Sequence, residues 1–374
     1  FVGLMKVKAF VAMGPGLAGM AMFVDPDNGK NILWAAVGLV ISVVASFALS
    51  FFLYKDETPA EDETAAPAPE TAADAAAADS TISSPLQGKA IALMFGKHST
   101  RTRTSLEVGI YQMGGLGTYL SAADMQIARG EPIQDTARVL GRYYDAIVYR
   151  TFKQSDVDAL ARYSGVPVVS GMTDYAHPLQ VLTDLMTVRE YKGKLAGLKF
   201  AYMGDARYNM GNSLMIGCAK MGLHFVACAP KAYWPAPELV EKCKAIAAET
   251  GATITLSDDT DAVKDADVVY TDVWVSMGEP VEVWAERIEA LAPYQVNTEL
   301  MAKAKPTAVF MHCLPAYHDH KTAVGKEMGE KFGRDAMEVT DEVFTGPQSI
   351  VFQEAENRMH TIKAVMAATL GAEF

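Results

Sequence analysis

Residues 90–103 read AIALMFGKHSTRTR, an apolar run that ends in a cluster of hydroxyl and guanidinium side chains. The run predicts a buried strand, and a helical pattern follows the cluster. A helix that starts directly after a strand presents unpaired backbone N–H groups and the positive end of its dipole. Guanidinium groups match phosphate oxygens in a bidentate way. The stretch therefore indicates a phosphate site in an α/β fold, although basic turns of this kind are often only solvated surface.

The same alternation of apolar runs and helical patterns continues along the chain. The predicted strands are 89–95, 146–149, 167–170, 199–203, 224–229, 253–256, 268–271 and 307–311. Helical patterns lie between them, for example at 178–192 and 238–250, and strands separated by helices imply parallel sheets with right-handed crossovers. We expect an α/β fold with two doubly wound parallel-sheet lobes, in 86–180 and 198–345, joined near 181–197.

The composition limits the classes of function. The 374-residue chain has a net charge of −12, which argues against nucleic acid as a partner. Eight acidic residues and no Lys or Arg lie between Asp56 and Gly88, so most of this charge is local. The four cysteines include no C-x-x-C pair and suggest no disulfide framework, which favours a reducing, cytoplasmic setting for the catalytic part.

The first 85 residues differ in composition from the rest. Residues 31–54 form an uncharged run of 24 residues between Lys30 and Lys55, longer than the about 20 residues that span a bilayer core. A buried core helix is the alternative, and the length makes it the weaker one. We expect a membrane segment in 1–55, with a transmembrane helix at 31–54 that anchors the chain. An Ala/Pro/acidic tract at 56–85 predicts a disordered linker.

Three motifs follow one another in the remaining chain: Ser99-Thr100-Arg101-Thr102-Arg103, His177-Pro178-Leu179-Gln180 and His312-Cys313-Leu314-Pro315. Taken singly they are weak, because a His before Pro is commonly a helix cap. Cys313 with His312, His318 and His320 could also be read as a zinc cluster, although the spacing matches no common structural site. In this order the motifs of 86–374 resemble the carbamoyltransferases, and within them the ornithine carbamoyltransferases.

The resemblance implies a carbamoyl-phosphate-binding domain of 86–182 plus 350–374 and an ornithine-binding domain of 183–349. It assigns these residues to carbamoyl phosphate: Ser99, Thr100, Arg101, Thr102, Gln126, Arg150, His177, Gln180, Cys313, Leu314 and Arg358. His177 would donate to the carbamoyl oxygen and Gln180 would accept from the carbamoyl amide. The catalytic set would be Arg101, Arg150, His177, Gln180, Asp272 and Cys313.

The same resemblance places ornithine in the second domain. Asn209 would contact its α-carboxylate and Asp272 its α-ammonium, while Ser276 and Met277 would hold the amino-acid end from a mobile loop. Gln126 would enter the site of a neighbouring subunit, which implies a homotrimer, whereas the residues alone indicate only a polar loop at 121–130. The implied reaction converts carbamoyl phosphate and L-ornithine to L-citrulline and phosphate, with no metal or organic cofactor.

The first 85 residues carry a second resemblance. Residues 14–57 are similar to the end of the membrane domain of a sugar permease of the bacterial phosphotransferase system. Because the octet LQGKAIAL at 86–93 fits both that system and the transferase, the seam suggests a fusion or an assembly artefact. The segment replaces the first helix of the transferase family, so an inactive, membrane-anchored chimeric fragment is the alternative function. Gly96 and Tyr208 also depart from residues that are usual in the family.

Overall fold

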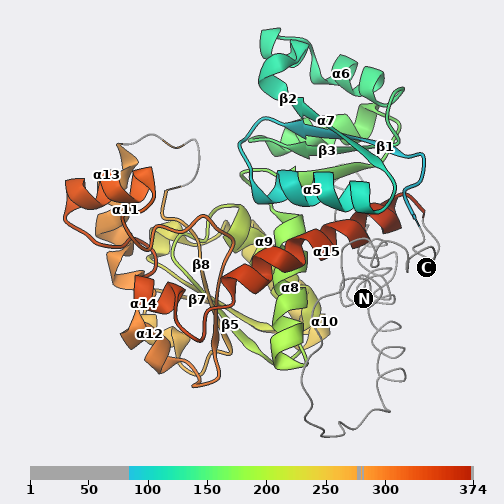
Figure 1. Ribbon diagram of the computed structural model, residues 1–374. Coiled ribbons are helices and arrows are strands. Elements are labelled where there is room, and N and C mark those ends of the chain that lie inside the picture. The colour runs from blue at the N-terminus through green and yellow to red at the C-terminus, as the bar shows by residue number, and fades with distance from the viewer. Residues whose placement is uncertain (1–83, 276–278, 280–281, 372–374) are drawn as a thin grey trace, which may run out of the picture.

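The computed structural model describes residues 84–275, 279 and 282–371, which form two lobes (Figure 1). The predicted transmembrane helix at 31–54 and all but the last two residues of the predicted linker lie outside this part of the chain. Among the described residues, none of the helices combines the length and the apolar character that a membrane span requires.

The first lobe is built on a four-stranded parallel sheet with the strand order β2-β1-β3-β4. Its strands are β1 (Ala90–Phe95), β2 (Leu116–Ser121), β3 (Ala146–Arg150) and β4 (Val168–Met172). Its helices are α5 (Arg101–Gln112), η1 (Ala122–Asp124), η2 (Gln126–Arg129), α6 (Ile133–Leu140) and α7 (Gln154–Tyr163). Helices cover both faces of this sheet, so β3 and β4 are buried along their whole length and β1 from its second residue onward.

Strand β2 is the element of this sheet that the sequence pattern does not predict. It lies at the edge, pairs only with β1, and alternates between exposed and half-buried residues. An edge strand of this kind needs no continuous apolar run, and its sequence LGTYLS has none. The predicted polar loop at 121–130 likewise contains the two short helices η1 and η2.

The second lobe is a five-stranded parallel sheet with the order β7-β6-β5-β8-β9. Its strands are β5 (Lys199–Met203), β6 (His224–Cys228), β7 (Ile254–Ser257), β8 (Val268–Thr271) and β9 (Val309–His312). Its α-helices are α9 (Asn209–Met221), α10 (Pro237–Thr250), α11 (Val283–Leu291), α12 (Thr298–Lys303), α13 (Ala323–Phe332) and α14 (Asp341–Phe344). Its 3₁₀ helices are η3 (Lys231–Tyr233), η4 (Thr260–Val263) and η5 (Ala292–Tyr294). The predicted α/β class with parallel sheets is confirmed for both lobes.

Two helices connect the lobes. Helix α8 (Pro178–Lys192) leaves the first sheet after β4, and α15 (Val351–Thr369) starts beside β9 and packs against both α8 and α5 (Figure 1). The Thr183 and Thr361 hydroxyls hydrogen-bond at 2.7 Å where these two helices touch. This packing brings the carboxyl ends of β1, β3, β8 and β9 to one place, where ligands bind in open α/β sheets.

Candidate active site

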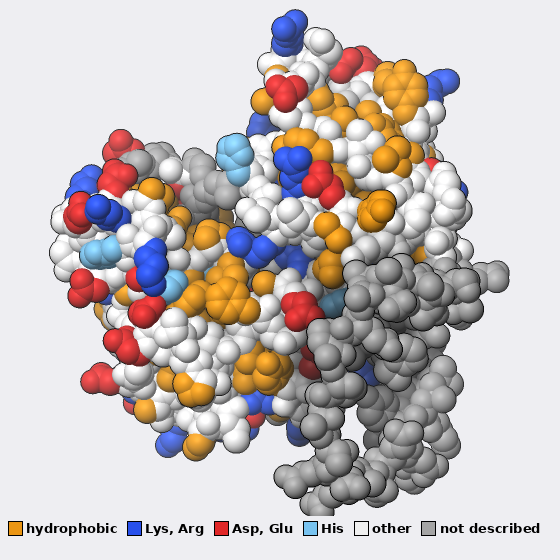
Figure 2. Space-filling view, in the orientation of Figure 1, with side chains coloured by type: hydrophobic (Ala, Val, Ile, Leu, Met, Phe, Trp, Pro, Cys, Tyr) orange, Lys and Arg blue, Asp and Glu red, His pale blue; other side chains and the backbone are white. Residues whose placement is uncertain are grey.

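Three arginines from distant parts of the chain meet where the lobes join. Arg101 begins α5, Arg150 ends β3, and Arg358 lies on α15. The Thr102 hydroxyl oxygen accepts hydrogen bonds from Arg358 Nη2 at 2.9 Å and from Arg150 Nη1 at 3.4 Å. Figure 2 shows basic side chains in the hollow between the two lobes. The predicted arginine set is therefore one spatial cluster.

The cluster is electrostatically unbalanced. Arg150 and Arg358 are only 7 % and 3 % exposed, and burial together with the neighbouring cations lowers their pKa values to about 9 and about 10. Burial also lowers the pKa of Arg101. In the described part of the chain, the Nε atoms of Arg150 and Arg358 have no hydrogen-bond partner. Converging cations with unused donors suit a multiply charged anion such as a phosphate.

His177 stands at the start of α8, directly before Pro178. Its backbone N–H donates to Ser213 Oγ at 2.8 Å, and its Nε2 lies 3.2 Å from Arg358 Nη2. Burial and four nearby cations lower the pKa of this imidazole well below 6.5. Because the guanidinium can only donate, Nε2 accepts and the ring proton belongs on Nδ1. His177 Nδ1 has no partner among the described residues, so it can donate to a ligand oxygen.

The first turn of α5 forms the opposite wall of the cluster. Ser99, which precedes the N-cap residue Thr100, accepts a hydrogen bond at its Oγ from the Thr102 N–H at 3.1 Å, and Thr100 is exposed. Lys97 lies behind this turn, 5 % exposed, with its ammonium paired to Asp174 and 4.2 Å from the Phe152 ring centroid. Its charge contributes to the low pKa of His177. Lys97 was not among the predicted site residues, although it lies in the stretch that carries Ser99, Thr100 and Arg101.

Gln180 lies in the first turn of α8 and contacts Arg358. Its Oε1 accepts a hydrogen bond from Arg358 Nη1, and its Nε2 donates to Asp184 Oδ1 and Glu354 Oε1, both at 2.8 Å. The two carboxyl groups were not among the predicted site residues. Asp184 follows Gln180 by one helical turn, a spacing that could have indicated it.

The second lobe contributes the ends of β8 and β9. Cys313 Sγ donates to Asp272 Oδ1 at 3.2 Å, and the Leu314 carbonyl oxygen accepts a hydrogen bond from Arg101. Burial raises the pKa of Asp272, and burial together with Asp272 raises the pKa of Cys313 well above 9. Cys313 is therefore a thiol near neutral pH, which does not suit a covalent nucleophile.

Other predicted residues lie elsewhere. Gln126 is exposed at the start of η2, and no hydrogen bond or ion pair of the described residues joins it to the arginines. Asn209 is half-buried at the first position of α9. Ser276 and Met277 lie outside the described residues.

The zinc alternative required Cys313, His312, His318 and His320 to form one cluster. The structure does not bring these four side chains together. His318 Nδ1 lies 2.7 Å from Asp341 Oδ1, and His320 Nε2 lies 3.0 Å from the Arg334 carbonyl oxygen. Among the described residues, the groups that could hold a metal ion are Asp272 with His312 and Cys313, and His318 with Asp319 and Asp341. His312 and Cys313 are therefore grouped with Asp272, without His318 or His320.

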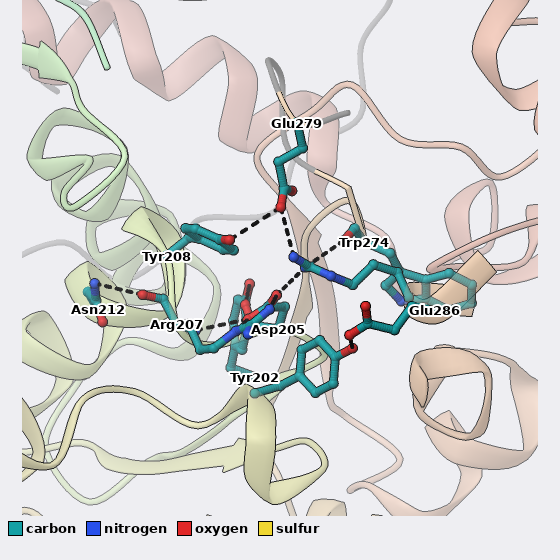
Figure 3. A network of polar contacts seen from close by, with 10 residues as sticks. Tyr202, Asp205, Arg207, Tyr208, Asn212, Trp274, Glu279 and Glu286 are labelled. Carbon is teal, nitrogen blue, oxygen red and sulfur yellow. Dashed lines mark hydrogen bonds and ion pairs between the residues drawn. The ribbon is translucent and has the colours of Figure 1, made fainter. Parts of the chain in front are cut away.

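A buried charge network supports the second-lobe side of the site (Figure 3). Asp205, which follows β5, accepts from Arg207 Nε and Nη2 at 2.9 and 2.8 Å and also from Arg287 of α11. Arg287 Nη2 donates to Glu279 Oε1 at 2.7 Å, and the Tyr208 hydroxyl reaches the same oxygen at 3.2 Å. Tyr208, one of the two residues expected to depart from the family pattern, therefore has a defined contact with Glu279.

Comparisons with known proteins agree with this geometry. The family model for the carbamoyl-P binding domain of aspartate/ornithine carbamoyltransferases matches residues 60–190, and that for the Asp/Orn binding domain matches 196–369. The chain is 57 % identical over 286 residues, 76 % of its length and 85 % of the relative's, to a catabolic ornithine carbamoyltransferase of Treponema denticola. It is 54 % identical over 288 residues, covering 76 % and 86 %, to the catabolic enzyme of Burkholderia pseudomallei.

Solved structures give the same result. The ornithine carbamoyltransferase from Pyrococcus furiosus superposes with a TM-score of 0.70 at 45 % identity, covering 78 % of this chain and 87 % of that one. The enzyme from Gloeobacter violaceus gives 0.65 at 40 % identity, covering 76 % and 87 %. With both lobes matched and the arginine cluster in place, the chain belongs to the aspartate/ornithine carbamoyltransferase family.

Proposed function

We propose that this chain is an ornithine carbamoyltransferase, which transfers the carbamoyl group of carbamoyl phosphate to the δ-amine of L-ornithine and releases L-citrulline and phosphate. The observation that carries the proposal is the convergence of Arg101, Arg150 and Arg358 with neutral His177, beside the Asp272–Cys313 pair. Cations suit the phosphate of one substrate, and an acid suits the ammonium of the other.

The proposed mechanism uses charge and orientation. The start of α5 and the arginines would hold the phosphate, while His177 Nδ1 and Arg101 would donate to the carbamoyl oxygen, where negative charge develops during attack. The uncharged δ-amine attacks the carbonyl carbon, the new N–C bond forms, and the bond between the carbonyl carbon and the bridging phosphate oxygen breaks. Phosphate leaves with that electron pair and takes up the proton that the amine loses. Holding both substrates in reacting geometry supplies much of the rate gain.

Several finer assignments belong to the same proposal. The carbamoyl-phosphate-binding domain would comprise 86–182 plus 350–374, and the ornithine-binding domain 183–349. Asn209, Ser276 and Met277 would hold the amino-acid end of ornithine, and Gln126 would complete a neighbour's site in a homotrimer. The exposure of Gln126 supports its assignment.

The proposal extends to the first 85 residues. The uncharged run at 31–54 supports a membrane anchor derived from a permease, with the catalytic part in the cytoplasm. The inactive chimeric fragment remains the competing function for the whole chain.

The direct test is citrulline formation from carbamoyl phosphate by the full chain, with ornithine, putrescine or aspartate as acceptor. We expect ornithine to be preferred and activity to rise on the alkaline side of neutral, because the δ-amine must be uncharged to attack. Arg150→Gln should abolish the reaction. A folded chain that forms no citrulline, or one that prefers another amine, would contradict the proposal.

A second chain that starts at Ser84 distinguishes the transferase from the inactive chimeric fragment. Activity in the full chain and in the shorter chain would make the first 83 residues dispensable. Aggregation of both chains without activity would support the chimeric fragment.

A further inference from the structure

Glu354 of α15 is a buried acceptor shared by three other elements. The side chain is 1 % exposed, and its Oε1 accepts from Gln180 Nε2 at 2.8 Å and from the Tyr270 hydroxyl at 3.2 Å. Its Oε2 accepts from the His312 backbone N–H at 3.1 Å. These donors belong to α8, β8 and β9, so one carboxylate touches the carbamoyl side of the site and the two strands that lead to Asp272 and Cys313.

The contacts of Gln180 determine how its amide is oriented. The amide nitrogen has two hydrogens, and its acceptors are Asp184 Oδ1 and Glu354 Oε1, each at 2.8 Å. In the reversed orientation, Oε1 would face two carboxyl oxygens and the NH₂ group would face the Arg358 guanidinium, which donates to Oε1 in the observed orientation. The two carboxyl groups therefore present Oε1, an acceptor, toward the arginine cluster.

The protonation of the two acids agrees with this arrangement. Both are buried, and burial together with the nearby Glu354 raises the pKa of Asp184 well above its ordinary value. Burial also raises the pKa of Glu354, but hydrogen bonds with Asp184, His312 and Tyr270 lower it, so Asp184 is the acid of the pair that holds its proton more strongly. Glu354, the stronger acid, is the one that receives hydrogen bonds from Gln180, Tyr270 and His312, and these favour a carboxylate.

We propose that Glu354, assisted by Asp184, is a positioning residue that fixes the amide of Gln180 so that the site recognises the NH₂ group of a carbamoyl donor. The inference rests on the proposed function and deepens it. An acyl phosphate with a methyl group in place of NH₂, such as acetyl phosphate, offers the same phosphate and carbonyl but nothing for Oε1 to accept. Discrimination between these two acyl phosphates therefore depends on Glu354, whereas affinity for the phosphate group does not.

The test compares Glu354→Gln with Glu356→Gln in the full chain. Glu356 lies on the same helix and is exposed, so the control makes the same change of charge outside the site. A glutamine at 354 has one acceptor oxygen where the carboxylate has two, so its NH₂ group must face either the His312 N–H or the Gln180 and Tyr270 donors, and the orientation of Gln180 is fixed less firmly. We expect Glu354→Gln to raise the KM for carbamoyl phosphate about tenfold and to change the inhibition constant of acetyl phosphate by less than about twofold. Glu356→Gln should change neither value.

A double-mutant cycle with Gln180→Ala shows whether Glu354 acts through Gln180. If it does, Glu354→Gln adds less than about twofold to the KM in the Gln180→Ala background. Additive effects, or an equal loss of affinity for both acyl phosphates, would overturn the proposal and leave Glu354 a purely structural residue. Glu354→Asp keeps the charge and tests rescue, and should recover part of the discrimination.

The increase in Tm that each acyl phosphate causes measures binding alone, so this form of the test does not depend on catalysis. A wild-type chain that forms no citrulline would contradict the proposed function. The role of Glu354 would still be supported if carbamoyl phosphate stabilises that chain more than acetyl phosphate does and Glu354→Gln removes the difference. If Glu354→Gln does not fold, the Glu354→Asp chain gives the same comparison. A Glu354→Asp chain with unchanged discrimination and an additive cycle with Gln180→Ala would overturn the inference.

Discussion

Arg101 donates a hydrogen bond from Nη2 to the backbone carbonyl oxygen of Leu314, 213 residues later in the chain. Arg101 begins α5 in the first lobe, and Leu314 follows β9 in the second. Leu314 has a positive φ of 59°, a conformation that is uncommon for a residue with a branched side chain. The contact joins the proposed phosphate side and the proposed amine side of the site through one guanidinium group.

Replacing Arg150 with Gln should remove activity without lowering the stability of the ligand-free protein. Arg150 is buried among like charges, so its removal relieves repulsion and a desolvation cost. We expect kcat/KM to fall by about 100-fold or more, with an unchanged or higher Tm. Inorganic phosphate at 100 times its Kd should stabilise the wild type by about 2.7 kcal/mol and the variant far less.

The matched control for this experiment is Arg142→Gln, because Arg142 is exposed at the surface of the same lobe. It should retain both activity and the phosphate-induced increase in Tm. A large drop in the Tm of ligand-free Arg150→Gln would contradict the view that the arginines repel one another.

Asp184→Asn should change how stability depends on pH. The pKa of Asp184 lies well above 3.8 in the folded state because of burial and Glu354, with Gln180 and Arg358 also facing it. The folded state therefore keeps a proton that the unfolded state releases above about pH 4. The free energy of unfolding of the wild type then decreases as pH rises toward the folded-state pKa, by up to about 1.4 kcal/mol per pH unit.

Urea denaturation at pH 5, 7 and 9 measures this effect. Asp184→Asn should gain stability relative to the wild type as pH increases, whereas the exposed Asp124→Asn should follow the wild-type curve. Parallel curves for Asp184→Asn and the wild type would mean that Asp184 has an ordinary pKa.

Cys313 should react slowly with iodoacetamide at pH 8, because burial and Asp272 raise the pKa of its thiol well above 9. Asp272→Asn removes the nearby negative charge and should accelerate the reaction, since the thiolate is the reactive form. Mass spectrometry of the peptide that carries Cys313 gives both rates, with glutathione as the reference thiol. Rapid labelling of the wild type would show that Cys313 ionises near neutral pH, and equal rates in the two chains would show that Asp272 does not raise the pKa of the thiol.

Asp205→Asn should strongly destabilise the second lobe. Asp205 is 8 % exposed and accepts from two arginines, of which Arg287 is 6 % exposed. Its neutralisation leaves the buried Arg287 with Glu279 in place of two acidic partners, and such a loss in a buried network costs about 3 kcal/mol. The control is Asp258→Asn, whose ion pair with Lys231 is 3.5 Å long and exposed; it should cost less than about 1 kcal/mol. Equal Tm values for the two variants would mean that the Asp205 network contributes little.

Much of the fold is predictable because burial on both faces leaves a continuous apolar run in the sequence. This holds for β3 and β4, which are buried along their whole length. It fails for β2, because an edge strand is half exposed and its residues carry little apolar signal. The turn proposed to bind phosphate is predictable for a local reason as well: the Ser99 hydroxyl accepts a hydrogen bond from the first turn of the helix that Arg101 begins.

The sequence by itself determined most of the elements and the side chains that stand at their ends, because apolar runs, helix starts and turns are local patterns; the edge strand β2 is the exception. Only the tertiary structure decided which of these ends meet. Thr102 contacts Arg150 and Arg358, which are 48 and 256 residues away, and Gln180 contacts Glu354 at a separation of 174. Such contacts depend on how α15 packs across both lobes, and no local pattern records that geometry. The charge imbalance at the arginines and the orientation of Gln180 follow from that packing.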